Sequence, residues 1–405
     1  MKYVVILGDG MADYPVSALG GKTPLAVAKK PYIDKLAAVS ETGLCRTVPK
    51  GMKPGSDVAN LSVLGYNPAE CYTGRSPLEA ASIGINLKDT DVTARANLVA
   101  LSEEQNFEDK TMLDYSAGEI TTEEAKELID YLGKELNDSV YTLYSGVSYR
   151  HCLVIDRGAI AGDLTPPHDI TGKKIKEFLP KSASGLKYLD MMKRSFELLK
   201  DHPVNVSRRK AGKLPANSLW FWGEGTKPVL QSFYERYGIK GGMISAVDLL
   251  KGIGKLTGMR VIEVAGATGN YDTDFAGKAR ACLDALADGL DYVYLHMEAP
   301  DECGHHGDLE HKIYSIEQID SEVVSRIVEG LEARGEEFSI LICPDHPTPL
   351  SIMTHCSDPV PYLIYRSGRK VKGVKKYDEE NAAGTGIVLQ SGVELAARFL
   401  ERDKF

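Results

Sequence analysis

Residues 295–308 read LHMEAPDECGHHGD, and this stretch decides how the rest of the chain is interpreted. It follows an apolar run that predicts a buried strand. Asp301 and His305 stand four residues apart, so one turn of helix would place both side chains on the same side. A carboxylate beside a neutral imidazole suits Zn, Mn or Fe better than Ca or Mg alone. Taken alone, the pattern also fits a solvated acidic loop with incidental histidines, so a metal site requires matching ligands from other segments.

Three further places offer such ligands beside predicted strands. Asp9 follows an apolar strand near the N-terminus, between two glycines. Asp345 and His346 follow a second apolar strand, and His355 stands just before a third. A parallel sheet would bring such strand ends to one edge. Six ligands exceed the needs of one tetrahedral Zn site and would suit two ions about 3.5–4 Å apart, although Asp9 by itself is equally consistent with a helix cap.

Ser56 is the candidate nucleophile. It follows Pro-Gly and precedes a segment expected to be helical, so its hydroxyl would lie at a helix N-terminus, where amide dipoles favour an alkoxide or a phosphate. A serine bound to a metal ion loses its proton readily and can attack phosphorus. The spacing alone also fits an ordinary N-cap serine. Ser62 is a second candidate, but it falls in the helix interior.

Alternating apolar strands and helices predict an α/β fold with a doubly wound, mostly parallel sheet. From about residue 86 the pattern changes to a mixture typical of a smaller, inserted α+β domain. We therefore expect a catalytic metal-binding domain made of residues 1–85 and 215–405, with a substrate-binding domain of residues 86–214 inserted between them. A strand expected at 218–222 is assigned to the returning parallel sheet.

Three basic side chains, one just before the expected insertion and two within it, could contact an anionic group. Arg75 follows Tyr-Thr-Gly, and Arg150 and His151 are neighbours on a predicted strand. Each could hold a phosphate or a carboxylate. Each is also consistent with ordinary surface charge, and the sequence leaves both readings open.

Composition narrows the classes of function. The 405 residues carry a formal net charge of −9, which argues against a general nucleic-acid-binding surface. Seven cysteines without a framework spacing fit a reducing compartment. We recognise no signal peptide and no apolar run of the roughly 18 residues that span a bilayer. We expect a cytoplasmic protein with no nucleic-acid or membrane partner, and leave the oligomeric state open.

Together these motifs resemble the alkaline phosphatase superfamily, and within it the archaeal-type, cofactor-independent phosphoglycerate mutases. The resemblance rests on GDGMAD with Asp9, PGSDVANLS with Ser56, PDECGH with Asp301, PDH with Asp345, and HCSDPVP with His355. It extends over nearly the whole chain, including YTGRSPLEA at 72–80 and ISAVDLLKGIGK at 244–255.

The resemblance implies interconversion of 2- and 3-phosphoglycerate through a phosphoserine at Ser56, without 2,3-bisphosphoglycerate. The substrate would be a small phosphorylated molecule. The resemblance further implies two divalent ions (Mn, Zn or Mg). One would be held by Asp301, His305 and His355, and the other by Asp9, Asp345, His346 and Ser56. The substrate contacts of the family would fall to Arg75, Arg150, His151 and Lys251.

One segment departs from the family pattern. Where the archaeal enzymes carry DRRAGR, residues 114–119 read DYSAGE, so Tyr115, Ser116 and Glu119 stand in place of arginines. The lost positive charge should weaken binding of a doubly anionic glycerate phosphate. A homoserine kinase-like phosphotransferase or a phosphomonoesterase is therefore an alternative, and a non-catalytic binding protein a more distant one. The chain shows no P-loop, because Val16 stands where the first glycine should be, and this favours the mutase.

Overall fold

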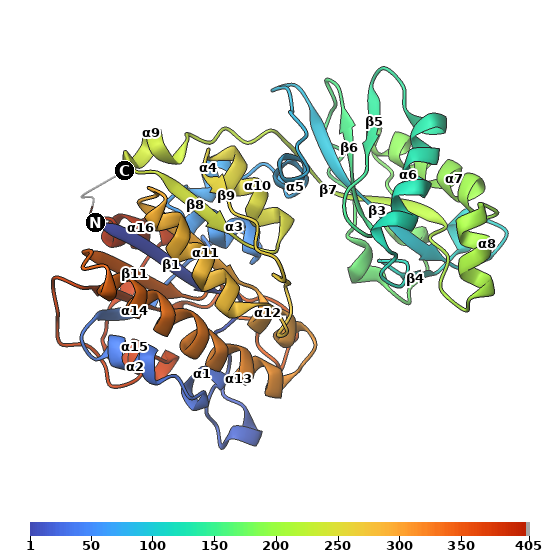
Figure 1. The fold of residues 1–405 in the computed structure, drawn as a ribbon. Coiled ribbons are helices and arrows are strands. Elements are labelled where there is room, and N and C mark those ends of the chain that lie inside the picture. The colour runs from blue at the N-terminus through green and yellow to red at the C-terminus, as the bar shows by residue number, and fades with distance from the viewer. Residues whose placement is uncertain (402–405) are drawn as a thin grey trace. The chain divides into compact units, whose positions relative to one another are not determined.

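A computed structural model describes residues 1–401, which form two compact units. The first comprises Met1–Tyr72 and the chain from Val229 onward, and the second comprises Thr73–Pro228. Each unit is built on a sheet of its own (Figure 1). No helix among residues 1–401 is long and apolar enough to cross a membrane.

The first unit contains an eight-stranded sheet in which most strand pairs are parallel. Its central strand, β1 (Lys2–Gly8), pairs in parallel with β10 (Tyr292–Met297) on one side and β11 (Phe338–Cys343) on the other. The other strands are β8 (Gly241–Ile244) and β9 (Arg260–Val261) beyond β10, and β12 (Val360–Arg366), β2 (Glu41–Cys45) and β13 (Val388–Leu389) beyond β11. The predicted mostly parallel sheet is confirmed.

Helices cover both faces of this sheet because its strands are apolar on both sides. Val4 and Ile6 of β1 point into the core formed with α11 and α13, whereas Val5 and Leu7 are equally buried on the opposite side. The helices are α1 (Pro24–Val27), α2 (Pro31–Ala37), α3 (Ser56–Val63), α4 (Pro68–Cys71), α9 (Phe233–Tyr237), α10 (Asp248–Leu256), α11 (Phe275–Ala287), α12 (Ala299–His305), α13 (Leu309–Gln318), α14 (Ser325–Ala333), α15 (Glu379–Gly384) and α16 (Gly392–Phe399). The doubly wound α/β class is therefore confirmed.

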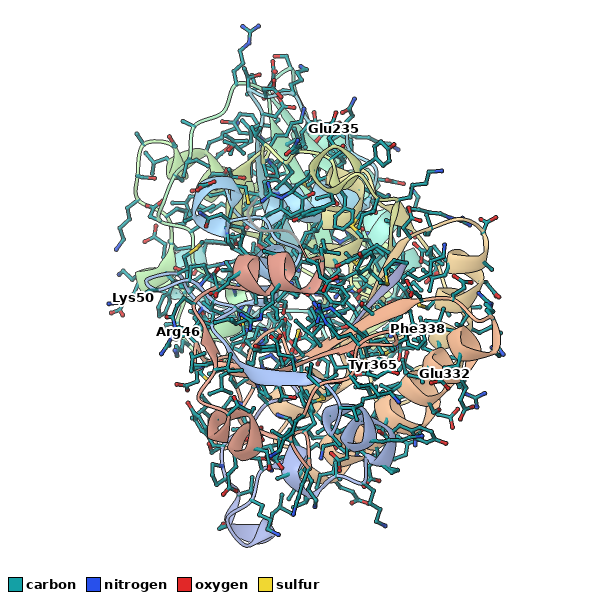
Figure 2. The ribbon with its side chains drawn as sticks, turned by 90° about the vertical axis from the view of Figure 1, so that its left-hand side faces the viewer. Arg46, Lys50, Glu235, Glu332, Phe338 and Tyr365 are labelled. Atoms are coloured by element: carbon teal, nitrogen blue, oxygen red, sulfur yellow. The ribbon has the colours of Figure 1, made fainter. Side chains whose placement is uncertain are left out.

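Because β12 pairs antiparallel with β11, it begins at the edge of the sheet at which β1, β10 and β11 end. Phe338 begins β11 and Tyr365 lies near the end of β12, with ring centroids 5.8 Å apart (Figure 2). The register continues through Ile342 opposite Leu363. The start of β12 therefore lies beside the end of β11, and so does the segment that carries His355.

The second unit contains an antiparallel five-stranded sheet centred on β3 (Val92–Leu101). Its neighbours are β6 (Arg150–Ile155), β7 (Ser218–Thr226) and β4 (Met112–Asp114), and β5 (Tyr141–Tyr144) pairs with β6. Ala94 and Ala96 of β3 belong to the core that α6 (Thr122–Leu136) and α7 (Gly185–Leu199) complete. Because side chains alternate along a strand, Arg95 and Asn97 point to the other face. Two further helices, α5 (Ser76–Ser82) and α8 (Pro203–Lys210), belong to this unit.

The second unit is wider than the expected insertion of residues 86–214. It begins 13 residues earlier because α5 packs against β3 and β7, and it ends 14 residues later because β7 continues to Thr226. The assignment of the strand at 218–222 to the parallel sheet is wrong. This strand is the first half of β7, which pairs antiparallel with β3.

Candidate functional site

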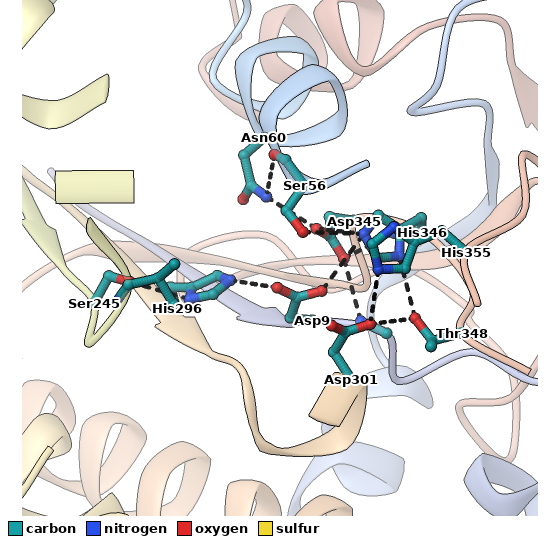
Figure 3. Close-up of polar contacts among 12 residues, drawn as sticks. Asp9, Ser56, Asn60, Ser245, His296, Asp301, Asp345, His346, Thr348 and His355 are labelled. Carbon is teal, nitrogen blue, oxygen red and sulfur yellow. Dashed lines mark hydrogen bonds and ion pairs between the residues drawn. The ribbon is translucent and has the colours of Figure 1, made fainter. Parts of the chain in front are cut away.

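The expected metal ligands meet at one edge of the first sheet, and all of them except His305 are labelled in Figure 3. β1, β10 and β11 run parallel and end at this edge, and β12 begins there because it runs antiparallel. The ligands follow this pattern: Asp9 comes after β1, Asp301 and His305 lie on α12 after β10, Asp345 and His346 come after β11, and His355 precedes β12. The single turn of helix predicted for Asp301 and His305 is confirmed.

The buried cluster consists of Asp9, Asp345 and His346, whose ligand atoms lie within 4.8 Å of one another. His346 Nε2 lies 3.3 Å from Asp345 Oδ2 and 3.7 Å from Asp9 Oδ1. The backbone N–H groups of Gly10 and His346 both donate to Asp345 Oδ1 and fix that carboxylate. Asp9 Oδ1 is buried without a hydrogen-bond partner among the described residues.

The rim cluster consists of Asp301, His305 and His355. Its two histidine side chains are 32% and 21% exposed, whereas that of His346 is fully buried. The Nε2 atoms of His305 and His355 lie 3.3 and 3.4 Å from the Asp301 carboxylate. In neutral His305, Nδ1–H donates to the Met353 carbonyl at 3.1 Å, so the lone pair on Nε2 faces the cluster. His346 also lies within 4.8 Å of Asp301 and His355, so the two clusters adjoin at its ring.

Charge repulsion among the carboxylates shapes this edge. Burial and the charges of Asp345 and Asp301 raise the pKa of Asp9 well above its usual range. Burial also opposes ionisation of Asp301, but the hydrogen bond from protonated His305, which carries hydrogens on both ring nitrogens, and the contact with His355 outweigh it and hold the Asp301 pKa well below its usual range. Burial lowers the pKa of His305, yet Asp301 prevails and raises it to about 9.

The residues present fit divalent metal ions. Three carboxylates and three imidazoles provide the mixed oxygen and nitrogen donors that Zn and Mn accept. The unpartnered Oδ1 of Asp9 is a buried acceptor that a cation would satisfy. A cation would also relieve the repulsion that raises the pKa of Asp9.

Ser56 reaches the buried cluster from the start of α3. It is the first residue of that helix and follows Gly55 in extended conformation. Its Oγ lies 3.2 Å from His346 Nε2. Ser62 is instead fully buried and accepts a hydrogen bond from the N–H of Gly392 at 3.0 Å. Ser56 is therefore the serine of α3 that faces the metal ligands.

Three polar residues that sequence analysis did not single out support the ligands. Asn60 donates to Asp345 Oδ2 at 2.9 Å and to the Ser56 carbonyl at 2.8 Å, which connects the helix of the candidate nucleophile to an expected ligand. Thr348 donates to Asp301 Oδ1, and His296 contacts Asp9 Oδ2 at 2.8 Å. Two of these residues could have been found from the sequence. Asn60 follows Ser56 by one helical turn, and His296 lies near the end of a buried strand.

The arginine cluster of the second unit consists of Arg75, Arg95 and Arg150 around Glu79. The Nε atoms of Arg75 and Arg95 lie 2.8 and 2.9 Å from the two carboxylate oxygens of Glu79. The Arg95 guanidinium also lies 4.3 Å from the centre of the Trp222 ring. Burial raises the pKa of Glu79, but the charges of Arg95, Arg75 and Arg150 outweigh it, so the pKa is lowered. Three cations around one anion leave positive charge for a ligand, and a charged residue inside the apolar strand 92–101 was the signal for Arg95.

Arg150 and His151, which were expected to share a ligand, point to opposite faces of the sheet. Arg150 is exposed and pairs in register with Asn97, on the face of the arginine cluster. His151 is buried opposite Ala96, on the core face. Its Nδ1 accepts a hydrogen bond from the N–H of Gly146 at 3.0 Å, and burial lowers its pKa to about 3. The structure does not bring these two side chains together.

Lys251, the fourth expected substrate contact, belongs to the first unit. It lies on α10, and its Nζ donates to Glu263 at 2.7 Å. The ammonium group therefore already has a carboxylate partner.

The variant segment 114–119 forms a compact turn that has no arginine or lysine of its own, although Arg208 of α8 donates to the Ala117 carbonyl at 2.5 Å. Asp114 Oδ1 accepts hydrogen bonds from the N–H and Oγ of Ser116 and from the N–H of Gly118. Tyr115 packs edge-on against Tyr149, with ring centroids 5.8 Å apart. The Ser116 hydroxyl therefore donates within the turn, and Tyr115 makes aromatic contacts with Tyr149 and His168.

Comparison with known proteins gives consistent matches. A family model described as 2,3-bisphosphoglycerate-independent phosphoglycerate mutase matches residues 37–205. A probable enzyme of that name from Geobacter sulfurreducens is 49% identical over 404 residues, covering 99% of this chain and 100% of the relative. The enzyme of that name from Methanothrix thermoacetophila is 50% identical over 397 residues, covering 98% of each.

Solved structures match over the whole length as well. A protein from Pyrococcus horikoshii is 30% identical with a TM-score of 0.82, covering 100% of this chain and 98% of its own. The cofactor-independent phosphoglycerate mutase from Thermoplasma acidophilum is 26% identical with a TM-score of 0.60, covering 99% of each chain.

Proposed function

Because the chain belongs to the 2,3-bisphosphoglycerate-independent phosphoglycerate mutase family, we infer that it interconverts 2-phosphoglycerate and 3-phosphoglycerate without that bisphosphate as a cofactor. The enzyme acts on a small phosphorylated substrate, and Ser56 carries the phosphoryl group between the two positions. The contact between Ser56 Oγ and His346 Nε2 is the observation that carries the role of this serine, since it brings a hydroxyl at a helix terminus to the buried cluster.

The phosphoryl group is transferred in two steps, first to Ser56 and then back to the glycerate. Ser56 Oγ attacks the substrate phosphorus, an Oγ–P bond forms and the ester O–P bond breaks, and the serine proton ends on the released glycerate hydroxyl. The glycerate then presents its other hydroxyl, takes the phosphoryl group back and returns a proton to Ser56. The amide dipoles at the start of α3 favour negative charge on Oγ. Exclusion of water keeps the phosphoserine from being hydrolysed.

Two divalent ions (Mn, Zn or Mg) would complete the site. Asp301, His305 and His355 would hold one of them, and Asp9, Asp345, His346 and Ser56 would hold the other. When bound, these ions lower the pKa of the serine hydroxyl and neutralise charge on the phosphoryl oxygens. The orphaned Asp9 Oδ1 and the mixed donor set support this reading.

The arginine cluster recognises the anionic groups of the substrate. Arg75 and Arg150 keep the role expected for them, and Arg95 joins them because Glu79 and Trp222 hold its guanidinium. Planar guanidinium groups match carboxylate and phosphate oxygens. His151 takes no part in this recognition, because it faces the core.

The mutase activity is tested by ³¹P NMR of 3-phosphoglycerate incubated with the Mn-loaded protein and no nucleotide. The expected result is the appearance of the 2-phosphoglycerate resonance up to equilibrium. Release of inorganic phosphate instead would show a phosphomonoesterase, in which water takes the phosphoryl group.

A kinase acting on homoserine is the second candidate, favoured by the segment 114–119. Tyr115, Ser116 and Glu119 supply no cation where the family resemblance expects arginines. Incubation with ATP and homoserine should therefore be run in parallel. If this incubation yields phosphohomoserine and the first assay yields no 2-phosphoglycerate, the protein is a kinase and the proposed mutase activity is wrong.

The enzyme acts in the cytoplasm and needs no nucleic-acid or membrane partner. All seven cysteines are free, and six of them are buried, which suits a reducing compartment.

A further inference from the structure

A hydrogen-bond chain runs behind the buried cluster through three neighbouring strands. His296 Nε2 lies 2.8 Å from Asp9 Oδ2, and His296 Nδ1 lies 3.2 Å from Ser245 Oγ (Figure 3). Ser245 Oγ also accepts a hydrogen bond from the N–H of Val247 at 3.0 Å. The three side chains are each less than 5% exposed. None of the expected ligand sets includes His296 or Ser245.

The parallel sheet fixes this chain of contacts. β8, β10 and β1 are consecutive neighbours, and Ile244 lies opposite Leu295. Ser245 and His296, which follow these two residues, therefore lie side by side. His296 in turn pairs in register with Leu7 of β1, two residues before Asp9. The geometry of the contacts is thus set by strand pairing and does not depend on a loop.

The partners also select one tautomer of His296. A carboxylate at Asp9 can only accept, so His296 Nε2 carries the hydrogen. Nδ1 then has a lone pair, which accepts the hydroxyl hydrogen of Ser245, while the Ser245 oxygen accepts from Val247. Each group in the chain has one role.

We propose that His296 is a positioning residue that holds Asp9 as a metal ligand, with Ser245 selecting the tautomer of His296 that can donate. One oxygen of Asp9 is anchored by His296, which leaves Oδ1 unpartnered and 3.7 Å from His346 Nε2. Partners of this kind orient a ligand and raise its affinity for metal. The proposal rests on the metal site of the proposed function.

The rim cluster has a different support, and this makes the effect of His296 specific. Asp301 is held by Thr348, and His305 by the Met353 carbonyl. Neither contact involves His296 or Ser245. Loss of His296 should therefore weaken the binding of one of the two metal ions and leave the binding of the other unchanged.

The test is Mn binding by titration calorimetry, with electron paramagnetic resonance to distinguish a coupled Mn pair from a single ion. The wild-type protein should bind two Mn ions. His296→Leu should weaken one of them about 10- to 100-fold and convert the coupled signal into that of an isolated ion. His296→Gln should recover part of the affinity, because its amide N–H reaches about as far as Nε2–H.

Two further variants sharpen the test. Ser245→Ala should weaken the same ion by less than His296→Leu, because the donor remains but its tautomer is no longer selected. His151→Leu, which removes a buried histidine of the second unit, should leave both affinities unchanged. Two unchanged Mn affinities in folded His296→Leu would overturn the proposal, as would equal loss of both ions without recovery in His296→Gln. A wild-type protein that binds no Mn would overturn the proposed metal site itself.

Discussion

The two units of the chain carry local charge of opposite sign. In the first, the carboxylates of Asp9, Asp301 and Asp345 gather at one edge of the sheet. In the second, three arginines surround the single carboxylate of Glu79. The formal net charge of −9 describes neither. Local clusters rather than net charge therefore decide the kind of ligand: the acidic edge suits cations, and the arginine cluster suits the phosphate and carboxylate of a small substrate.

Removing the hydroxyl of Ser56, the proposed nucleophile, should produce the largest effect in the first unit. Ser56→Ala should lower turnover of 3-phosphoglycerate by more than about a thousand-fold, because no hydroxyl remains to accept the phosphoryl group. Mn content should change little, since the carboxylates and imidazoles are intact. Ser62→Ala is the matched control and should stay active, because Ser62 bonds to Gly392. Comparable turnover by the two variants would contradict the role of Ser56.

Removing one proposed metal ligand from either cluster should produce the next largest effect. Asp345→Asn removes a charged ligand from the buried cluster, and His305→Ala removes an imidazole from the rim cluster. Each substitution should lower the affinity for one Mn ion more than about a hundred-fold, which is more than the loss of a supporting residue does. Activity should fall to match, and excess Mn should partly restore it. Mn titration checks this. Two intact affinities in either variant would exclude that residue as a ligand.

A smaller effect is expected in the second unit, on substrate affinity. Arg150→Ala loses a charge-assisted hydrogen bond of roughly 1.5–3 kcal/mol, which should raise KM about 10- to 100-fold with little change in Mn affinity. Arg157→Gln changes another exposed arginine of this unit and serves as control. Steady-state kinetics distinguishes the two. Equal KM values for both variants would remove Arg150 from substrate recognition.

The smallest effect concerns stability. Burial lowers the pKa of His151 to about 3, against about 6.5 in an unfolded chain, so the unfolded state binds more protons below pH 6.5. Stability should therefore fall as the pH falls, and this residue should account for a loss of about 1.6 kcal/mol between pH 6.5 and pH 5. Urea unfolding should show a weaker pH dependence for His151→Gln over this range. An unchanged slope would mean that His151 is not held neutral by the fold.

Much of the acidic edge could be predicted from sequence, because parallel strands bring their carboxyl ends together whatever their order. Asp9, Asp301 and Asp345 each follow or lie close behind an apolar strand, and that pattern is local. The position of His296 near the end of a buried strand was a local signal, but its contact with Ser245 could not be recognised in this way. Their contact depends on β8 lying beside β10, and no local pattern reveals which strands are neighbours.

The second unit was harder to predict for a related reason. The apolar strand β7 (Ser218–Thr226) reads like the strands of the parallel sheet, yet it pairs with β3. Its partner is decided by tertiary packing, so the expected boundary at residue 214 fell before it. The opposite directions of Arg150 and His151, in contrast, follow from strand alternation and could have been foreseen.

The most direct test of the account is to locate the transferred phosphoryl group. The Mn-loaded protein is mixed with 3-phosphoglycerate labelled on its phosphorus, without nucleotide, quenched within milliseconds and mapped by mass spectrometry. The expected result is labelled phosphoserine at Ser56 together with labelled 2-phosphoglycerate. Protein that holds two Mn ions but gives neither product, or that carries the label on another residue, would contradict it.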